Sequence, residues 1–322
     1  MDVLFLFFLS FILALSIGTS NGAVSMSPSF GAGILSARKL LLIAGLSIFL
    51  GASLFGKEVA DTIGKGLVPF RILSETYFSL SFFLNSILFI VLANIARVPI
   101  ATTEIVVLSV ASIGLQTGSL NIAKLIKIIL WWLSIPPITF IFGFLFERYL
   151  YFVIVDLFAK LKDSEKIRKF FRFSTLLMGA YFAFASGANN AANSVGVLAG
   201  AGYVSPTYGV LIAGVFMGLG SILFSVRIVH AVGLGITNIG LLRASFLEFM
   251  QATIILIASF LGIPVSINQT VTSGIIGISF AREGRQVLRK SIVLRILFFW
   301  FVVPWLSVFT CILLSKILRF FI

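Results

Sequence analysis

Apolar stretches separated by short polar clusters run through the whole chain of 322 residues. Several of these stretches are shorter than the roughly 20 residues that a helix needs to cross a bilayer. The short ones border clusters of Gly, Pro, Ser, Thr and Asn, and irregular backbone is tolerated at membrane depth only where protein or a polar cavity covers it. The pattern therefore predicts full spans together with broken helices and re-entrant hairpins. The apolar stretches are 4–17, 40–55, 77–96, 105–115, 125–145, 176–184, 210–224, 246–261, 271–280 and 292–314.

The composition places the chain in a membrane. Hydrophobic residues make up 59% and charged residues 11%, with a mean hydropathy of +1.14, which leaves too little polar surface for a water-soluble fold. A helical architecture follows, because the alternating segments of about ten residues that form membrane strands are absent. We therefore predict an all-α, polytopic protein of the cell membrane with about 10–12 membrane segments, whose first helix is retained rather than cleaved as a signal peptide.

The polar clusters repeat along the chain. Residues 18–25 (GTSNGAVS) and 187–194 (GANNAANS) are versions of one motif, separated by 169 positions, from 18 to 187. Further along, residues 99–104 (PIATTE) correspond to 264–269 (PVSINQ), with a separation of 165 positions, from 99 to 264. Two repeats that each interrupt apolar runs at matching places are typical of secondary transporters built from inverted repeats, in which the substrate site lies between the two halves.

Positive charge gathers at the ends of the apolar stretches. The net charge is +13, and the densest cluster of Lys and Arg lies at 160–172. We interpret these cations as positive-inside topology signals and lipid headgroup contacts, and not as a nucleic-acid-binding surface. The chain is therefore divided into a first membrane repeat at 1–159, a basic cytoplasmic linker at 160–172 and a second membrane repeat at 173–322.

The polar residues of the motif at 187–194 occur where a helix should continue through hydrocarbon. Leaving each amide there without a partner would cost about 1 to 3 kcal/mol. One explanation is that they bond neighbouring helices, with Gly and Ala allowing close approach. The other is that four broken elements, two in each repeat, converge on one cavity. Half-helix N-termini carry free N–H groups and a positive dipole end, so such a cavity favours an anion.

These motifs resemble those of the inorganic phosphate transporter family. Each half of that family carries a Gly-Ala-Asn-Asp-x-Ala-Asn motif, followed later by a Pro-Val-Ser-Thr-Thr-His segment. Residues 187–193 match the first motif except that Asn190 replaces its Asp. In the first repeat Gly18 and Ala23 match, whereas Asn21 takes the place of the Asp, and Ser20 and Val24 take the places of the two Asn residues.

The second motif of the family also has a counterpart in each half. Glu104 and Gln269 occupy the positions at which the family has His. The resemblance covers nearly the whole chain, and it implies a homodimer with one transport path in each chain. Inverted repeats with a central polar site fit transport by alternating access.

The departures from the family pattern bear on the substrate. Phosphate near neutral pH carries a P–OH proton that a carboxylate accepts, whereas sulfate needs only donors, and a carboxylate would repel it. Since Asn21 and Asn190 are both amides, we predict sulfate, and the pattern resembles the sulfate permease branch of the family. A sodium- or proton-coupled phosphate symporter is the alternative within the family, and an anion channel is the alternative from another class.

Glu104 is the acidic residue placed inside a core motif, and an intramembrane carboxylate is a functional candidate because its ionised form is costly there. We predict that Glu104 carries a coupling proton, sodium being the alternative coupling ion. The competing interpretation is a carboxylate that caps a hairpin helix or pairs with Arg97. A second charged set marks either a gate or helix ends at the membrane surface. It consists of Lys57, Glu58 and Asp61 in the first repeat and of Val226, Arg227 and His230 at the equivalent places in the second.

The predicted donor cage around the anion draws on both repeats. With eleven acidic residues and one His, the sequence shows no cluster with the spacing of an enzyme active site or a metal site, and we predict neither a catalytic activity nor a cofactor. The predicted substrate-binding residues are Ser20, Asn21, Ser25, Thr102, Thr103, Asn189, Asn190, Asn193, Ser194, Ser266, Asn268, Gln269 and Thr270.

Overall fold

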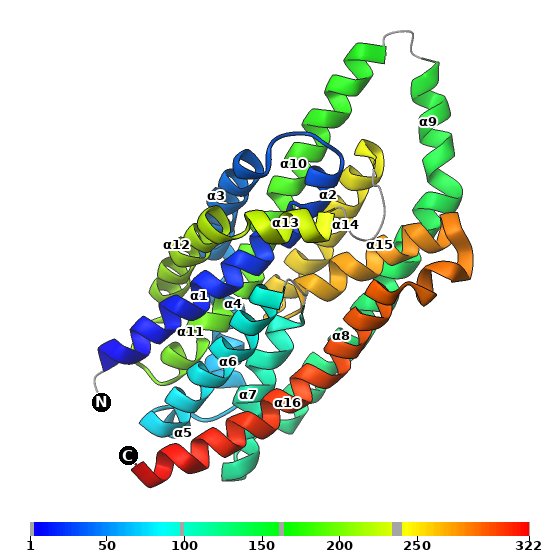
Figure 1. The fold of residues 1–322 in the computed structure, drawn as a ribbon. Helices are drawn as coiled ribbons and strands as arrows, with labels where there is room; N and C mark the ends of the chain where they lie inside the picture. Colours follow the sequence, from blue (N-terminus) through cyan, green and yellow to red (C-terminus); the bar gives the residue numbers. More distant parts are fainter. Residues whose placement is uncertain (1–2, 97–99, 161–163, 234–239, 322) are drawn as a thin grey trace.

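The computed structural model describes residues 3–96, 100–160, 164–233 and 240–321. In these residues every regular element is a helix, and the longer helices run side by side along one direction of the molecule (Figure 1). Both termini lie at one end, and a hairpin formed by α9 and α10 projects from the other end (Figure 1).

The order of helices repeats along the chain. The first part contains α1 (Val3–Ser25), α2 (Ser27–Gly31), α3 (Ala37–Phe55), α4 (Lys57–Asp61), η1 (Thr62–Gly66), α5 (Phe70–Leu73), α6 (Thr76–Ala96), α7 (Thr102–Thr117), α8 (Ile122–Leu145), η2 (Phe146–Leu150) and α9 (Tyr151–Ala159). The second part contains α10 (Ser164–Asn190), α11 (Ala192–Gly200), α12 (Pro206–Phe224), α13 (Val226–Gly233), α14 (Leu241–Phe260), α15 (Ile267–Glu283), η3 (Gly284–Arg289) and α16 (Ser291–Phe321). Helices α1, α3, α6, α7 and α8 are thus followed in the same order by α10, α12, α14, α15 and α16.

Seven helices in the described residues are long and apolar enough to cross a membrane. They are Val3–Ser25, Ala37–Phe55, Thr76–Ala96, Ile122–Ala159, Pro206–Phe224, Leu241–Phe260 and Val293–Phe321. The other segments that the sequence predicts correspond to shorter or more polar helices, namely α7, α15 and the α10–α11 stretch. The chain is therefore a helical, multi-pass membrane protein.

Helices of each repeat pack against helices of the other repeat. α1 packs on α12, α10 packs on α3, and α3 packs on α12. Gly18 faces α12 so closely that an added Cβ would lie 2.0 Å from the carbonyl oxygen of Met217, and a Cβ on Gly187 would lie 2.0 Å from the carbonyl oxygen of Ile48. Gly18 and Gly187 are repeat equivalents, and so are Ile48 and Met217. These reciprocal contacts are those that two repeats related by a two-fold axis make, and α1 and α10 run in opposite directions in Figure 1.

The first motif of each repeat lies largely within helices, whereas the second motif of each repeat lies where a helix starts. α1 continues through residues 18–25 before α2 starts at Ser27, and α10 continues to Asn190 before α11 starts at Ala192. The break follows the motif in the first repeat, at Met26, and lies inside it in the second repeat, at Ala191. The second motif leads directly into α7 and α15, of 16 and 17 residues. These two are the half-helices that the sequence predicts, with their N-termini at the motif.

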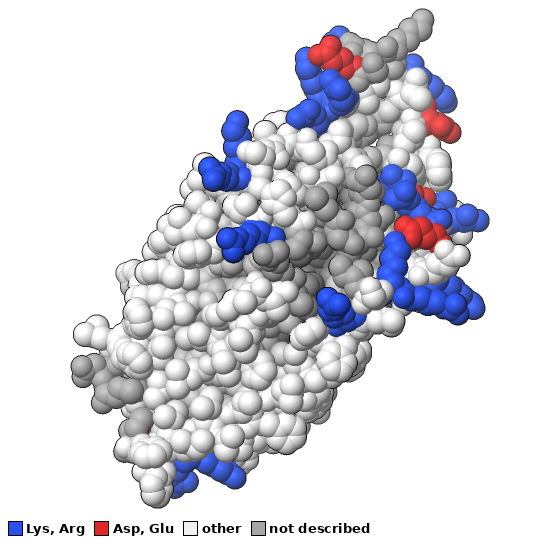
Figure 2. Space-filling model, viewed as in Figure 1, with Lys and Arg blue, Asp and Glu red and all other residues white. Residues whose placement is uncertain are grey.

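Charged side chains mark the two ends of the molecule. On the face drawn in Figure 2, Lys and Arg gather towards the end where α9 and α10 project, fewer lie at the opposite end, and a broad uncharged surface separates them. This distribution matches a membrane band between two polar ends. Part of the predicted linker, 161–163, lies outside the described residues, and residues 164–172 of it form the first turns of α10.

Candidate functional site

The N-termini of the two half-helices meet at the centre of the protein. Thr103, in the first turn of α7, lies 3.0 Å from the carbonyl oxygen of Val265, which precedes α15. Asn268, in the first turn of α15, donates from Nδ2 to the carbonyl oxygen of Ile100, which precedes α7. Thr103 and Asn268 are repeat equivalents, as are Ile100 and Val265, so these two bonds form a symmetric pair across the junction of the repeats.

The first motif of each repeat reaches the same junction. The hydroxyl of Thr103 lies 3.2 Å from Oδ1 of Asn190 and accepts a hydrogen bond of 3.0 Å from Nδ2 of Asn193. Nδ2 of Asn268 lies 3.4 Å from the hydroxyl of Ser20 on α1. The structure thus brings together α1, α7, the end of α10, the start of α11 and α15, all through residues that the sequence predicts for the site.

Several amide atoms at this junction are buried without a hydrogen-bond partner in the part of the chain that the structure describes. They are both side-chain atoms of Asn21, Nδ2 of Asn190, Oδ1 of Asn193 and Oδ1 of Asn268. Buried polar groups are almost always paired, because an unmade hydrogen bond costs about 1–3 kcal/mol. Four neighbouring asparagines with free polar atoms are therefore expected to pair with a bound polar ligand or with water.

Asn189 has a different role from its neighbour Asn190. Its Nδ2 donates to the hydroxyl of Ser259 and to the carbonyl oxygen of Ile263, both at 3.0 Å, and its Oδ1 accepts from the backbone N–H of Val265 at 2.9 Å. These bonds join α10 to α14 and to the segment that leads into α15. The arrangement is the interhelical bonding that polar side chains provide within membranes.

Replacing Asn189 by Ala is expected to lower the free energy of unfolding by about 2 kcal/mol, because it leaves a buried N–H and a buried carbonyl group unpaired. Thermal unfolding of the purified protein would measure this loss. Ser259→Ala is the matched control, since it removes a single contact of the same side chain and should cost less. Equal losses for the two variants would contradict the conclusion that Asn189 joins α10 both to α14 and to the segment before α15.

The other predicted hydroxyl residues are engaged within their own helices. Ser25 donates to the carbonyl oxygen of Gly22, Ser194 to that of Ala191, and Thr270 to that of Ser266. The hydroxyl of Ser266 accepts from the backbone N–H of Gln269 and so caps α15. Thr102 is buried at the start of α7. These side chains shape the helix ends next to the four asparagines.

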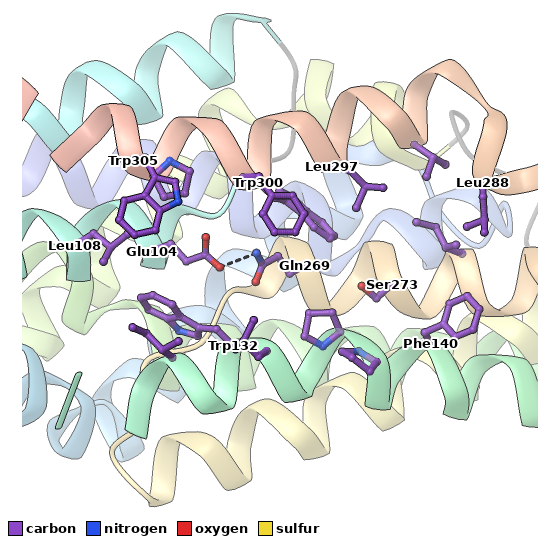
Figure 3. A pocket seen from close by; sticks show the side chains of 18 residues that line it. Glu104, Leu108, Trp132, Phe140, Gln269, Ser273, Leu288, Leu297, Trp300 and Trp305 are labelled. Atoms are coloured by element: carbon purple, nitrogen blue, oxygen red, sulfur yellow. Dashed lines mark hydrogen bonds between the residues drawn. The ribbon is translucent and has the colours of Figure 1, made fainter. Parts of the chain in front are cut away.

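Glu104 and Gln269, which are repeat equivalents, bond to each other. Nε2 of Gln269 donates to Oε1 of Glu104 at 2.6 Å. The pair lies at the floor of a cavity of about 520 Å³ between α8 and α16, whose walls are largely aromatic and aliphatic (Figure 3). Trp132 on α8 lines this cavity and donates to the carbonyl oxygen of Pro264 at 2.8 Å. Arg97, the alternative partner of Glu104, lies outside the described residues.

Glu248, a fully buried carboxylate on α14, lies outside the set of residues predicted from the sequence. Its Oε1 accepts from the backbone N–H of Ser29 at 2.9 Å and from the hydroxyl of Ser29 at 2.6 Å. The available signal was one acidic residue inside the apolar stretch 246–261. Among the residues that the structure describes, no group of three or more His, Cys, Asp or Glu side chains is arranged to hold a metal ion.

Comparison with known proteins places this architecture in a family. The family model described as "Phosphate transporter family" matches residues 17–311. The sulfate permease CysP of Bacillus subtilis (strain 168) is 32% identical over 302 residues, which cover 92% of this chain and 83% of that protein. The putative phosphate permease PF1020 of Pyrococcus furiosus is 27% identical, with 91% of this chain and 90% of the relative covered.

A solved structure has the same fold. The structure titled "The sodium-dependent phosphate transporter" superimposes with a TM-score of 0.82, covers 98% of each chain and shares 24% of its sequence. The family match extends through both copies of both motifs, and the alignment with the sulfate permease covers 92% of the chain. This chain therefore belongs to the phosphate transporter family, whose members are transporters and not enzymes.

Proposed function

We propose that the protein is a secondary active transporter that carries sulfate by alternating access and is driven by protons. The observation that carries this proposal is the group of unpaired, buried amide atoms on Asn21, Asn190, Asn193 and Asn268. They come from both repeats: Asn190, Asn193 and Asn268 bond to residues where α7 and α15 begin, and Asn21 follows Ser20, which lies 3.4 Å from Asn268. A ligand bound there would contact the two halves at once, as alternating access requires.

Two of the five unpaired atoms, Nδ2 of Asn21 and Nδ2 of Asn190, are donors that a fully deprotonated oxyanion can use, whereas the three Oδ1 atoms are acceptors that water can satisfy. Asparagine Nδ2 atoms and hydroxyls donate hydrogen bonds, and the backbone N–H groups at the starts of α7 and α15 add donors and a positive dipole end. Asn21 and Asn190 stand where the family motif has Asp, so neither site of the motif offers a carboxylate to accept a P–OH proton. The relative named as a sulfate permease supports the same choice.

Radiolabelled sulfate uptake into proteoliposomes of the purified chain tests the proposal. Phosphate and thiosulfate serve as competitors, and proton and sodium gradients are imposed separately. The expected result is saturable uptake that follows the proton gradient and ignores phosphate. Competition by phosphate together with sodium dependence would overturn it in favour of phosphate symport, the second candidate, which the names of relatives such as the phosphate permease PF1020 support.

Glu104→Gln is expected to abolish sulfate accumulation driven by a pH gradient while leaving sulfate exchange at equilibrium in place. The reason is that Glu104 is the buried acid next to the predicted site, and a neutral side chain can keep the bond to Gln269 but cannot carry a proton. Accumulation and counterflow measured on the same vesicles would separate the two effects. Glu165→Gln, in an exposed ion pair with Lys169, is the control, and unchanged proton dependence in Glu104→Gln would remove this residue from coupling.

An anion channel with the same half-helices is the competing function class. Counterflow, in which unlabelled sulfate inside the vesicles accelerates the entry of labelled sulfate, is a property of carriers. Its absence, together with flux that does not saturate, would favour the channel. The homodimer that the family resemblance implies forms part of this proposal, with one complete site in each chain.

A further inference from the structure

The two repeats are packed differently at one pair of equivalent seams. In the second half, α14 lies along α10, whereas in the first half the equivalent α6 packs less extensively along α1. The contacts between the repeats, of α1 with α12 and of α10 with α3, are closely matched. These contacts are therefore symmetric, and the two halves differ in how closely α6 and α14 pack on α1 and α10.

Three phenylalanines lie over the seam between α3, α10 and α14, with Phe55 and Phe184 half-buried and Phe260 55% exposed. The ring centroid of Phe55 lies 5.7 Å from that of Phe184 and 4.9 Å from that of Phe260, and both pairs meet edge to face, at 69° and 81°. Edge-to-face aromatic pairs are favourable. This seam is closed by apolar side chains from all three helices.

The equivalent seam in the other half is open. The repeat equivalents of the three phenylalanines are Phe224, Leu15 and Ile95, and all three line a cavity of about 490 Å³ between α1, α6, α12 and α13. Polar groups share this lining, including Ser16 and the side chain of Arg227. The cavity thus occupies the place that the aromatic plug fills on the other side.

The closed seam and the open seam are joined by different hydrogen bonds. In the second half, Asn189 on α10 donates to the hydroxyl of Ser259 on α14 at 3.0 Å. The repeat equivalents of these residues are Ser20 and Asn94. Instead of pairing with Ser20, Asn94 donates to the carbonyl oxygen of Ser16 at 2.8 Å, and Ser20 lies 3.4 Å from Asn268. The open seam therefore also contains an asparagine and a serine, Asn94 and Ser20, but they do not bond to each other.

Arg227 gives the open cavity its charge. It is exposed at the start of α13 and is the repeat equivalent of Glu58, so equivalent surfaces carry opposite charges. A cation at the mouth of a recessed cavity raises the local concentration of anions. Thr19, the neighbour of Ser20 in the sequence, also lines this cavity, which places the cavity directly beside the first motif.

We propose that the cavity between α1, α6, α12 and α13 is the aqueous vestibule through which an inorganic dianion reaches the asparagine site, with Arg227 as the residue that attracts it. The plug of Phe55, Phe184 and Phe260 is the closed gate on the equivalent path through the other half. The inference rests on the proposed function, because it assumes that the asparagine site binds an anion. Since Arg172 at the start of α10 donates to the carbonyl oxygen of Ile34 before α3, and the start of α3 packs on α13, the vestibule opens on the side of the α9–α10 hairpin.

Cysteine accessibility tests the vestibule without requiring transport. The one native cysteine is removed by Cys311→Ser, and Ser16→Cys is compared with its repeat equivalent, Ala185→Cys, which is fully buried. A membrane-impermeant thiol reagent added from the α9–α10 side should modify Ser16→Cys at least about tenfold faster than Ala185→Cys. This ratio is expected if the conformation that is open on the α9–α10 side is the more populated one. Equal rates, or no reaction at Ser16→Cys because lipid fills the cavity, would overturn the proposal.

The plug is tested in the Ala185→Cys background. Phe55→Ala should increase the reaction of this cysteine with reagent added from the opposite side of the membrane, because it removes the ring that both aromatic pairs share. Phe224→Ala, the repeat-equivalent change, should leave that reaction unaltered and is the matched control. An increase in both variants, or in neither, would show that the three rings do not form a gate.

Arg227→Gln should raise the half-saturating sulfate concentration for exchange across the α9–α10 face about two- to fivefold and weaken its dependence on ionic strength. Arg227→Lys should restore most of the affinity. Arg38→Gln removes the same charge from an exposed residue of α3 outside the cavity lining, and it should change neither quantity. If wild-type protein carries no sulfate, the proposed function fails while the cysteine result still decides whether the vestibule exists.

Discussion

Replacing Asn21 and Asn190 together by Asp is expected to weaken sulfate binding on the order of 100-fold, because it places buried negative charge at a site for a dianion. Both residues are fully buried, and together they contribute three of the amide atoms that have no partner in the described structure. The same change supplies acceptors for a P–OH proton, so binding of phosphate should improve. Competition of each anion with labelled sulfate would measure both effects.

Asn121→Asp is the matched control for this substitution. Asn121 is exposed and caps α8 by accepting from the backbone N–H of Lys124, and Asp serves equally well at an N-cap. Sulfate affinity should therefore be unchanged in this variant. If sulfate bound as tightly or more tightly to the Asn21→Asp, Asn190→Asp protein, the explanation of anion choice by missing carboxylates would be wrong.

The repeat can be seen in the sequence because it is a property of residue order. The separations of 169 and 165 positions correctly pair helix with helix, from α1 and α10 through to α7 and α15. They also pair Gly18 with Gly187, although they do not reveal that each touches the other repeat. That packing of one repeat on the other is a tertiary contact, decided by which backbones approach closely enough to exclude a Cβ.

The sequence could not distinguish the two adjacent asparagines at the end of α10. Asn189 and Asn190 have the same side chain, and their difference comes from rotation around the helix, which turns one towards α14 and the other towards the start of α7. The same limit applies to Glu248, whose partner Ser29 is distant in the chain. Hydrogen-bond partners of this kind depend on packing, which the pattern of apolar and polar positions does not encode.

The repeat also explains why Glu104 and Gln269 meet. Equivalent residues of two repeats related by a two-fold axis approach each other only near that axis, so the contact between Glu104 and Gln269 is the one that such an axis would produce. An acid and its amide analogue form one hydrogen bond there, where two acids would repel each other in a poorly solvated site. The asymmetry between the repeats at this position is the chemical basis for proposing that one proton is carried by one side chain.

The close contacts between the repeats give the second large effect. Gly187→Ala is expected to lower the free energy of unfolding on the order of 3 kcal/mol, since the added Cβ would lie 2.0 Å from the carbonyl oxygen of Ile48 and the backbones of α10 and α3 would have to separate. Gly18→Ala meets the same distance to Met217. The two losses should therefore be similar, which thermal unfolding of the purified variants would measure.

Gly240→Ala is the control for these glycine substitutions, because the nearest atom to its added Cβ is a side-chain nitrogen at 3.9 Å. Its stability should stay within about 1 kcal/mol of the original protein, because the substitution meets no packed contact and costs only what Ala loses against Gly at the N-cap of α14. Equal losses at Gly18 and Gly187 would mean that the two repeats depend on each other through equivalent contacts. If Gly187→Ala were as stable as Gly240→Ala, α10 and α3 would not approach as described, and the conclusion that helices of each repeat pack against the other repeat would have to be abandoned.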